Sequence, residues 1–372
     1  MDVPLTADGQ PALSNAPTKR ASFPPPGAPS WNELNWYILP TNWISWSGYN
    51  SSMNFLITGA AGFLGSHLAN QLAREGHMVR GLDDLSTGDP QVLDPDVHFT
   101  RGDVNDRPKL WTLLQEVDCV YHLAARISVP ESMLYPREYN TSNVGGTVSL
   151  MEAMRDVGIR RVVLASSGAI YGEQDLQPLT EGQTPRPGSP YAVSKLAAEY
   201  YVSTIGRLWG IETVSLRIFN AYGPGQHLSA SHPPVVPYFL RQAVRGGTLV
   251  VHGDGYQSRD YVYVDDVVCA MVAAATAPNL NGLVINVGSG VETSLRALTK
   301  LVLDVTGSHA NVVYNAQTSG GVSRLWADLK LAEQKLGYKP AFRLEDGLRL
   351  TLQKDVRFKI TKELNAKDTE KV

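Results

Sequence analysis

The feature that most constrains the fold is a short apolar run that leads directly into a glycine-rich turn. Residues 54–58 (NFLIT) have the pattern of a buried strand, and residues 59–65 (GAAGFLG) follow at once, before a helix-like stretch. In this context glycines permit a tight turn, close approach of the backbone to a pyrophosphate, and close packing of helix on strand. The N–H groups at the start of the helix would face the anion. The pattern therefore predicts a dinucleotide site.

The chain then alternates short apolar runs with amphipathic stretches. Expected strands lie at 54–58, 77–83, 97–103, 117–124, 161–167 and 212–220. Expected helices lie between them, at 63–74, 107–116, 140–157 and 189–209. This order predicts an α/β fold with a doubly wound parallel sheet of the Rossmann type, covered by helices on both faces.

The texture changes after residue 221, where Gly- and Pro-rich loops surround helices expected near 234–246, 265–277 and 293–306. We expect a dinucleotide-binding domain at 53–224 and a smaller α/β lobe at 225–353 that binds the substrate, from which a segment such as 284–287 could return to the main sheet. Residues 354–372 form a charged tail. For the irregular residues 1–52 two interpretations stay open: either Met53 is the natural start and they are not native, or they form a Trp-rich arm that covers an apolar patch.

Composition argues against several classes of function. The net charge is −3, without a block of like charges, which gives no reason to expect nucleic acid or a membrane surface as a partner. No apolar run approaches the ~20 residues of a membrane span. The two cysteines, Cys119 and Cys269, lie in apolar runs, which disfavours a disulfide framework and fits a cytoplasmic location. The eight histidines lack metal-ligand spacings such as HExxH, so we expect no metal site.

Carboxylates end the second and third expected strands. Asp83 lies about 18 residues after the last glycine of the turn, where a carboxylate accepts hydrogen bonds from the adenosine ribose hydroxyls. It would also repel a 2′-phosphate, so we expect NAD rather than NADP. The neighbouring Asp84 suits a turn cap better. Asp103 could meet the adenine amino group or only cap its own turn.

The stretch 191–195 (YAVSK) places Tyr191 and Lys195 on one face of a helix, one turn apart. A phenol ionises near pH 10, and a nearby ammonium or a cationic nicotinamide favours the phenolate. This spacing alone is common in helices. Here it follows 166–172 (SSGAIYG), in which Ser167 brings a hydroxyl to the carboxyl edge of the sheet. The three residues together predict a proton-transfer site.

At this point the sequence resembles the extended short-chain dehydrogenase/reductase family, specifically its NAD-dependent nucleotide-sugar epimerase/dehydratase branch. The resemblance covers about residues 53–350. Its motifs are GAAGFLG (59–65), LDDLSTG (82–88), GDV (102–104), HLAA (122–125), NVGGT (143–147), SSGAIYG (166–172), YAVSK (191–195), RIFNAYGPGQ (217–226), GDGYQSRDYVYVDDV (253–267) and INVGSG (285–290).

The resemblance implies a tightly held NAD, with Tyr191 as the base, Lys195 as its electrostatic partner and ribose ligand, and Ser167 as a hydrogen-bonding hydroxyl. The cofactor contacts that it implies are Gly59, Gly62, Phe63, Leu64, Gly65, Asp83, Asp103, Val104, Ala124, Tyr191 and Lys195.

Residues 168–169 separate the branches of that family. Dehydratases and decarboxylases usually carry an acid shortly before the YG that follows the strand-end hydroxyl, whereas this chain has Gly168 and Ala169. Elimination of water needs such an acid and base. The departure argues against dehydration and leaves reversible hydride transfer, as in the UDP-glucose 4-epimerases, which invert C4 of a UDP-sugar through a 4-keto intermediate.

The resemblance places the substrate contacts mainly in the second lobe. Arg259 and Arg324 match arginines that grip the diphosphate, although Arg324 could equally be a surface arginine. Asn220 matches a residue that reaches the diphosphate region, or it forms a turn after its strand. Ser128 falls where the family often touches the sugar, and Tyr171 either lines that pocket or belongs to the core.

Fewer residues in the sequence bear on the identity of the sugar. UDP-glucose and UDP-galactose are favoured, because Trp326 could crowd a 2-acetamido group. A UDP-glucuronate or UDP-N-acetylhexosamine 4-epimerase, a dehydratase and a simple ketone reductase stay open as alternatives. The resemblance also implies a homodimer that pairs the helices at 107–116 and 140–209.

Overall fold

The computed structural model describes residues 52–229, 231–315 and 321–359, all of which belong to one compact unit, Ser51–Val372. Apart from Ser52, the interpretations of residues 1–52 concern residues outside these ranges. The tail from residue 360 onward also lies outside these ranges. The first part of the expected tail, however, forms a short 3₁₀ turn, η5 (Val356–Phe358), with the Phe358 side chain buried.

A parallel sheet of seven strands forms the centre, in the order β10-β6-β5-β4-β1-β2-β3. Its strands are β1 (Asn54–Thr58), β2 (Met78–Asp83), β3 (Val97–Arg101), β4 (Cys119–His122), β5 (Arg161–Ser167), β6 (Glu212–Ile218) and β10 (Leu283–Val287). The fold class expected from the sequence is confirmed. The edge strand β10 comes from the expected second lobe and pairs in parallel with β6.

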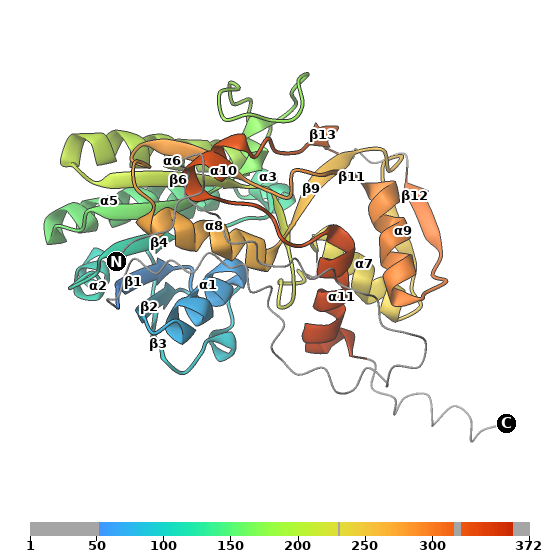
Figure 1. Cartoon of the computed structure of the whole chain (residues 1–372), viewed down its shortest axis with the longest axis horizontal. Coiled ribbons are helices and arrows are strands. Elements are labelled where there is room, and N and C mark those ends of the chain that lie inside the picture. The colour runs from blue at the N-terminus through green and yellow to red at the C-terminus, as the bar shows by residue number, and fades with distance from the viewer. Residues whose placement is uncertain (1–51, 230, 316–320, 360–372) are drawn as a thin grey trace, which may run out of the picture. The chain divides into compact units, whose positions relative to one another are not determined.

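Helices cover both faces of this sheet (Figure 1). Two helices lie on one face: α1 (Phe63–Arg74) and α8 (Val264–Thr276). Three lie on the other: α2 (Arg107–Leu113), α5 (Gly146–Val157) and α6 (Pro190–Trp209). Each face has its own apolar core, one including Leu68 and Val267 and the other including Leu150 and Val202. Burial of these two layers holds the strand ends in fixed positions.

The connections at the carboxyl edge contain short elements. These are η2 (Pro90–Val92), α3 (Val129–Leu134), α4 (Pro136–Tyr139), η3 (Asn140–Gly145) and η4 (Gly168–Tyr171). The helix expected at 140–157 is thus two pieces, because η3 is a π-helical turn that precedes α5. Such turns widen the backbone locally and frequently mark functional sites.

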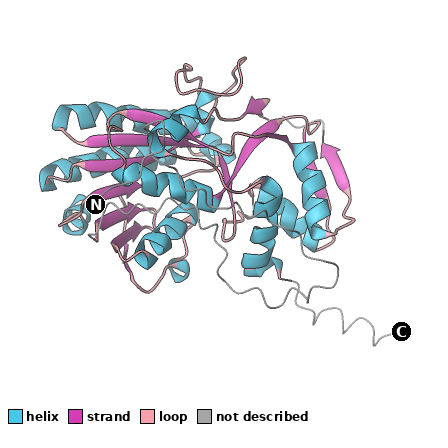
Figure 2. Ribbon diagram, in the orientation of Figure 1, coloured by secondary structure: helices cyan, strands magenta, loops and turns pink. Residues whose placement is uncertain are grey.

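A smaller α/β lobe holds the remaining elements (Figure 2). Its strands are β7 (Asn220–Tyr222), β8 (Leu249–His252), β9 (Ser258–Tyr263), β11 (Glu292–Ser294), β12 (Val312–Asn315) and β13 (Arg324–Leu325). Its helices are α7 (Val235–Val244), α9 (Leu295–Thr306) and α11 (Leu344–Lys354). Helix α10 (Lys330–Leu336) instead packs against β10 and α8 of the central layers. In this lobe β9 pairs with β7, β11 and β13.

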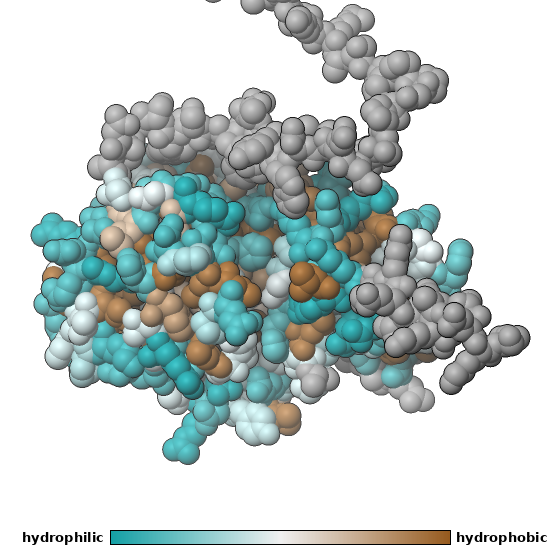
Figure 3. Space-filling view, turned by 90° about the horizontal axis from the view of Figure 1, so that it is seen from below, coloured by the Kyte–Doolittle hydropathy of each residue, from teal (hydrophilic) through white to brown (hydrophobic). Residues whose placement is uncertain are grey.

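On the face drawn in Figure 3, hydrophobic residues occur in small groups among hydrophilic ones. Within the described ranges no helix combines the length and the apolar character needed to cross a bilayer.

Candidate active site

The glycine turn after β1 is packed tightly against the end of β4. Gly59 has a φ of +75°, and a Cβ on it would lie 2.7 Å from the Ala124 N atom. A Cβ on Gly65 would lie 2.0 Å from the Gly59 carbonyl oxygen. Helix α1 begins at Phe63, and its N-cap Gly62 provides no side-chain acceptor for the N–H groups of the first turn. A helix start of this kind suits an anionic ligand such as a pyrophosphate.

Asp83 holds the same turn from the end of β2. Its Oδ2 accepts a hydrogen bond from the Ala61 N–H at 3.0 Å and its Oδ1 accepts one from the Leu85 N–H at 2.9 Å. Burial raises the pKa of this carboxyl, and these backbone hydrogen bonds oppose the rise. The adjacent Asp84 accepts from the Ser86 N–H at 2.8 Å, as a turn cap does.

Two further expected cofactor contacts, Asp103 and Val104, follow β3 at the same edge of the sheet. Asp103 Oδ1 accepts from the Asn105 N–H at 2.8 Å and from its Nδ2 at 3.0 Å, which is the geometry of a turn cap. Val104 is buried, and its Cγ1 lies 2.4 Å from where a Cβ on Gly146 would stand. Glycine at 146 therefore lets α5 approach this strand end closely.

The expected proton-transfer residues come together at the carboxyl edge of β5. Tyr191 and Lys195 lie in the first turns of α6, and Ser167 is the last residue of β5. The Tyr191 hydroxyl lies close enough to the Ser167 side chain for Ser167 to lower the Tyr191 pKa. Lys195 Nζ donates to the Ala165 carbonyl at 2.9 Å. The structure thus brings the three predicted residues together at one end of β5, and their roles stay a prediction.

The electrostatics differ between the two titrating residues. Burial lowers the pKa of Lys195 to about 8, with the Glu199 carboxylate acting in the opposite direction. Burial raises the pKa of Tyr191, and the Ser167 hydrogen bond opposes this rise. The sequence led us to expect that Lys195 would lower the Tyr191 pKa, but in the structure the effects on this pKa come from burial and from Ser167.

Several buried polar residues next to this site were missed at the level of sequence. His122 ends β4, and its ring nitrogens lie 2.7 Å from Thr58 Oγ1 and 2.9 Å from Thr147 Oγ1. Asn143, in the π-helical turn, donates to Ser194 Oγ of α6 at 2.8 Å. The motifs HLAA and NVGGT contained these residues, yet spacing alone gave no sign that their side chains meet.

The expected substrate residues are more dispersed. Asn220 is exposed in β7. Ser128 is the N-cap of α3, and its Oγ accepts from the Glu131 N–H at 3.3 Å. Tyr171 is fully buried and belongs to a core cluster, which agrees with the second of the two interpretations offered for it.

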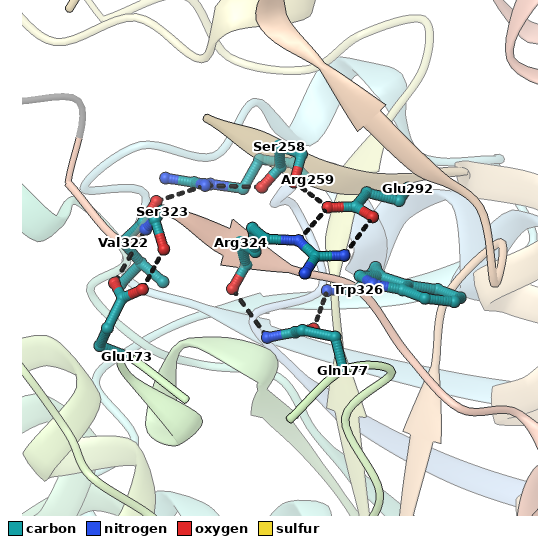
Figure 4. Close-up of polar contacts among 9 residues, drawn as sticks. All are labelled: Glu173, Gln177, Ser258, Arg259, Glu292, Val322, Ser323, Arg324 and Trp326. Carbon is teal, nitrogen blue, oxygen red and sulfur yellow. Dashed lines mark hydrogen bonds and ion pairs between the residues drawn. The ribbon is translucent and has the colours of Figure 1, made fainter. Parts of the chain in front are cut away.

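The two expected diphosphate arginines point away from each other. In the strand pairing, Arg324 stands opposite Ser258, and Arg259 stands opposite Leu325. Because side chains alternate along a strand, the two arginines lie on opposite faces of this β9–β13 pair, as Figure 4 also shows. The two guanidinium groups therefore do not face the same side of this strand pair, and their contact with a diphosphate stays a prediction.

The hydrogen-bond partners of Arg259 and Arg324 differ as well. Arg259 is half-buried, and its Nη1 donates to the carbonyls of Ser258 and Val322, both at 2.7 Å. Arg324 makes two 2.7 Å hydrogen bonds to the Glu292 carboxylate and is 51% exposed. Exposure and a carboxylate partner favour the surface interpretation of Arg324, while its place in the binding site stays a prediction.

A search of residues 52–229, 231–315 and 321–359 finds no group of three or more His, Cys, Asp or Glu side chains suited to a metal ion. Cys119 is buried, and Cys269 is partly buried; neither is in a disulfide.

The parallel sheet, the glycine turn at its first strand and the Ser–Tyr–Lys group at its carboxyl edge define a dinucleotide-binding α/β enzyme fold. Residues 55–288 match the NAD dependent epimerase/dehydratase family. The chain belongs to that family.

Individual relatives match over most of their length. A UDP-glucose 4-epimerase of Mycolicibacterium smegmatis is 39% identical over 311 residues, which are 81% of this chain and 98% of the relative. A crystal structure of UDP-glucose 4-epimerase with UDP-glucose from Thermotoga maritima superposes with a TM-score of 0.78 at 35% identity, covering 81% of this chain and 98% of that one. The Thermus thermophilus UDP-glucose 4-epimerase in complex with NAD gives a TM-score of 0.75 at 34% identity, covering 81% and 98%.

Proposed function

We propose that this protein is an NAD-dependent epimerase that inverts C4 of a UDP-sugar, with UDP-glucose and UDP-galactose as its favoured substrates. The observation that carries the proposal is the convergence of Ser167, Tyr191 and Lys195 at the same edge of the sheet as the glycine turn. The family and the relatives named above support both the cofactor and the reaction.

Each residue has a defined task in this proposal. NAD, when bound, would supply a reversible hydride acceptor for C4 of the sugar. Tyr191 takes the proton of the 4-hydroxyl, and Ser167 donates a hydrogen bond to the same oxygen. The resulting 4-keto sugar rotates to present its other face before Tyr191 returns the proton. The positive charge of Lys195 stabilises the Tyr191 phenolate.

The pKa directions constrain when this base can work. Because burial raises the pKa of Tyr191, the phenolate needs positive charge beside it. Lys195 supplies one such charge, and an oxidised nicotinamide supplies another. We therefore expect cofactor binding to lower the pKa of Tyr191.

The residues after Ser167 support epimerisation over dehydration. Gly168 is buried, and a Cβ on it would meet the Phe219 ring at 3.2 Å. Position 168 has no room for an acidic side chain without movement of that ring, and position 169 is alanine. The acid and base that elimination of water requires are thus missing from this turn.

Trp326 supports a plain hexose. It is half-buried in the segment that follows β13, and its backbone carbonyl accepts from the Leu179 N–H at 2.8 Å. This bond fixes the backbone at Trp326, and the indole lies next to the strand that carries Arg324 (Figure 4). In this proposal a bulky side chain at that place disfavours an added acetamido group.

The direct test is to incubate the purified protein with UDP-galactose and no added cofactor. Formation of UDP-glucose, together with release of NAD on denaturation, is expected. Dependence on added NADH with net reduction of the sugar would contradict the proposal and favour a ketone reductase. The Tyr191→Phe variant keeps the ring but lacks the hydroxyl, so it should fold and lose turnover. A panel with UDP-glucuronate and UDP-N-acetylglucosamine ranks the substrates.

We also propose a cytoplasmic homodimer. Helix α6 exposes Val193, Tyr200, Tyr201 and Leu208, apolar side chains that a second copy could cover. The unpaired cysteines agree with a reducing compartment. Light scattering should give twice the chain mass, and Tyr200→Glu should shift it toward the monomer. A monomeric wild-type protein would refute the dimer.

A further inference from the structure

Three polar residues form a row across adjacent strands beneath the proposed catalytic group. Ser166 of β5 stands opposite Arg217 of β6, and Arg217 stands opposite Asn286 of β10. Residues paired in this way carry their side chains on one face of a sheet. All three are buried, with exposed fractions of 5%, 5% and 0%. Polar groups so far from water persist only with partners.

Glu199 of α6 is the partner that joins two of them. Its Oε1 accepts from Ser166 Oγ at 2.5 Å and from Arg217 Nε at 3.0 Å, and its Oε2 accepts from Arg217 Nη2 at 2.9 Å. Glu199 follows Lys195 by one helical turn, and Lys195 follows Tyr191 by one turn, so the three side chains lie on one face of α6. The carboxylate thus ties this face to the end of β5.

The other side of the row fixes the turn that follows Ser167. The Arg217 guanidinium lies over the Tyr171 ring, 4.8 Å from its centroid. The Tyr171 hydroxyl donates to Asn286 Oδ1 at 2.7 Å. Tyr171 ends η4, the turn that begins directly after Ser167. Ser167 is therefore held between two anchored neighbours, Ser166 before it and Tyr171 after it.

A buried ion pair is a costly way to gain stability. Taking both ions out of water costs several kcal/mol each, and apolar residues of similar volume often stabilise a fold as well or better. The location of this pair, next to Lys195, suggests a different use. The Glu199 carboxylate is the group whose charge counteracts the effect of burial on the Lys195 pKa.

We propose that Glu199 is a positioning residue for the reaction: clamped by Ser166 and Arg217, its carboxylate fixes Ser167 and Lys195 relative to Tyr191 and holds the Lys195 side chain in its charged form. This inference rests on the proposed epimerase function. Glu199 is 2% exposed and bonded to Ser166 and Arg217, so in this proposal it acts through its neighbours and not by contact with the sugar or the cofactor.

Other groups near Lys195 do not replace this charge. His122 of β4 faces Lys195, and burial lowers the pKa of its imidazole to about 3, so it stays neutral. Tyr191 adds a negative charge only when it acts as the phenolate. Arg217 is positive and bonded to Glu199, and Tyr139 of α4 stacks edge-on against the Tyr191 ring at 6.4 Å. Among the residues that the structure describes, Glu199 is thus the negative charge that acts on Lys195.

The test uses the Glu199→Gln variant of the full chain with its cofactor bound. The amide keeps the size of the side chain but removes the charge, so the Lys195 pKa should fall by about one unit. The fall of kcat on the alkaline side of its pH profile should then begin at lower pH. Turnover should be roughly fivefold below wild type at pH 8 and nearly equal at pH 6, with KM for the UDP-sugar unchanged.

Two further variants separate positioning from plain stability. Glu212→Gln breaks the Arg161–Glu212 pair, which joins the same two strands at their opposite ends, and should leave the pH profile of wild type intact. The double variant Glu199→Gln/Arg217→Met removes both buried charges. It should recover the melting temperature of wild type while its alkaline limb stays displaced.

The inference would be overturned if kcat of Glu199→Gln fell at the same alkaline pH as kcat of wild type. It would also be overturned if the double variant regained both the stability and the alkaline pH dependence of wild type. If wild type turns over no UDP-sugar, the proposed function fails instead. In that case the pH dependence of NAD affinity tests the role of Glu199 instead of kcat. The fall in affinity at high pH should begin about one pH unit lower in Glu199→Gln than in wild type. Coincident affinity curves would refute the role of Glu199.

Discussion

His122 should make the stability of this protein depend steeply on pH below neutrality. The ring is 2% exposed at the end of β4, and burial lowers its pKa from 6.5 to about 3, with the Lys195 charge acting in the same direction. Its hydrogen bonds explain why it must stay neutral. Thr147 Oγ1 donates to the Asn143 carbonyl at 2.6 Å, so it accepts from the His122 Nε2–H, and we assign the Thr58 hydroxyl as donor to Nδ1.

The size and sign of the effect follow from linkage. An unfolded chain binds a proton on this ring below about pH 6.5, whereas the folded chain does not until about pH 3. Stability is therefore fully present above pH 6.5 and is lost as the pH falls through that window. A displacement of about 3.5 units corresponds to about 5 kcal/mol in total, of which about 2 kcal/mol is lost by pH 5.

Urea unfolding at pH 7 and pH 5 measures this loss. The variant His122→Gln cannot take up the proton, so its free energy of unfolding should fall by about 2 kcal/mol less than that of wild type between these pH values. The exposed His98 of β3 provides the matched control, and His98→Gln should behave as wild type. Equal losses in wild type and His122→Gln would refute the assignment.

Three further variants test the cofactor and sugar sites. Gly65→Ala would place a Cβ 2.0 Å from the Gly59 carbonyl oxygen and should lose bound NAD, measured by its absorbance after denaturation, whereas Gly188→Ala, where nothing lies within 4 Å, should retain it. Asp83→Ser removes the carboxylate at the end of β2 and should weaken NAD binding roughly tenfold while improving NADP binding, both by calorimetry. Trp326→Ala should raise kcat/KM for UDP-N-acetylglucosamine relative to UDP-glucose, and an unchanged ratio would remove this tryptophan from sugar selection.

The central sheet and the glycine turn could be predicted because their signals are local. A buried parallel strand is a continuous apolar run, and the turn between β1 and α1 needs glycine at fixed offsets. The π-helical turn at Asn140–Gly145 has no comparable signal. Its polar side chains, including Asn143, satisfy partners that are distant in sequence, so the pattern there indicated only one longer helix.

The same distinction between local and distant signals explains the arginines and Glu199. The sequence placed Arg259 and Arg324 in one site, but the faces they occupy depend on the register of β9 against β13, and that register sends them to opposite sides. For Glu199 the helical spacing after Lys195 is visible in the sequence. That this carboxylate is buried against Arg217 depends on how α6 packs over β6. Residue types and spacing therefore predicted which groups move protons, whereas the contacts of the residues proposed to position them depend on the register of the strands.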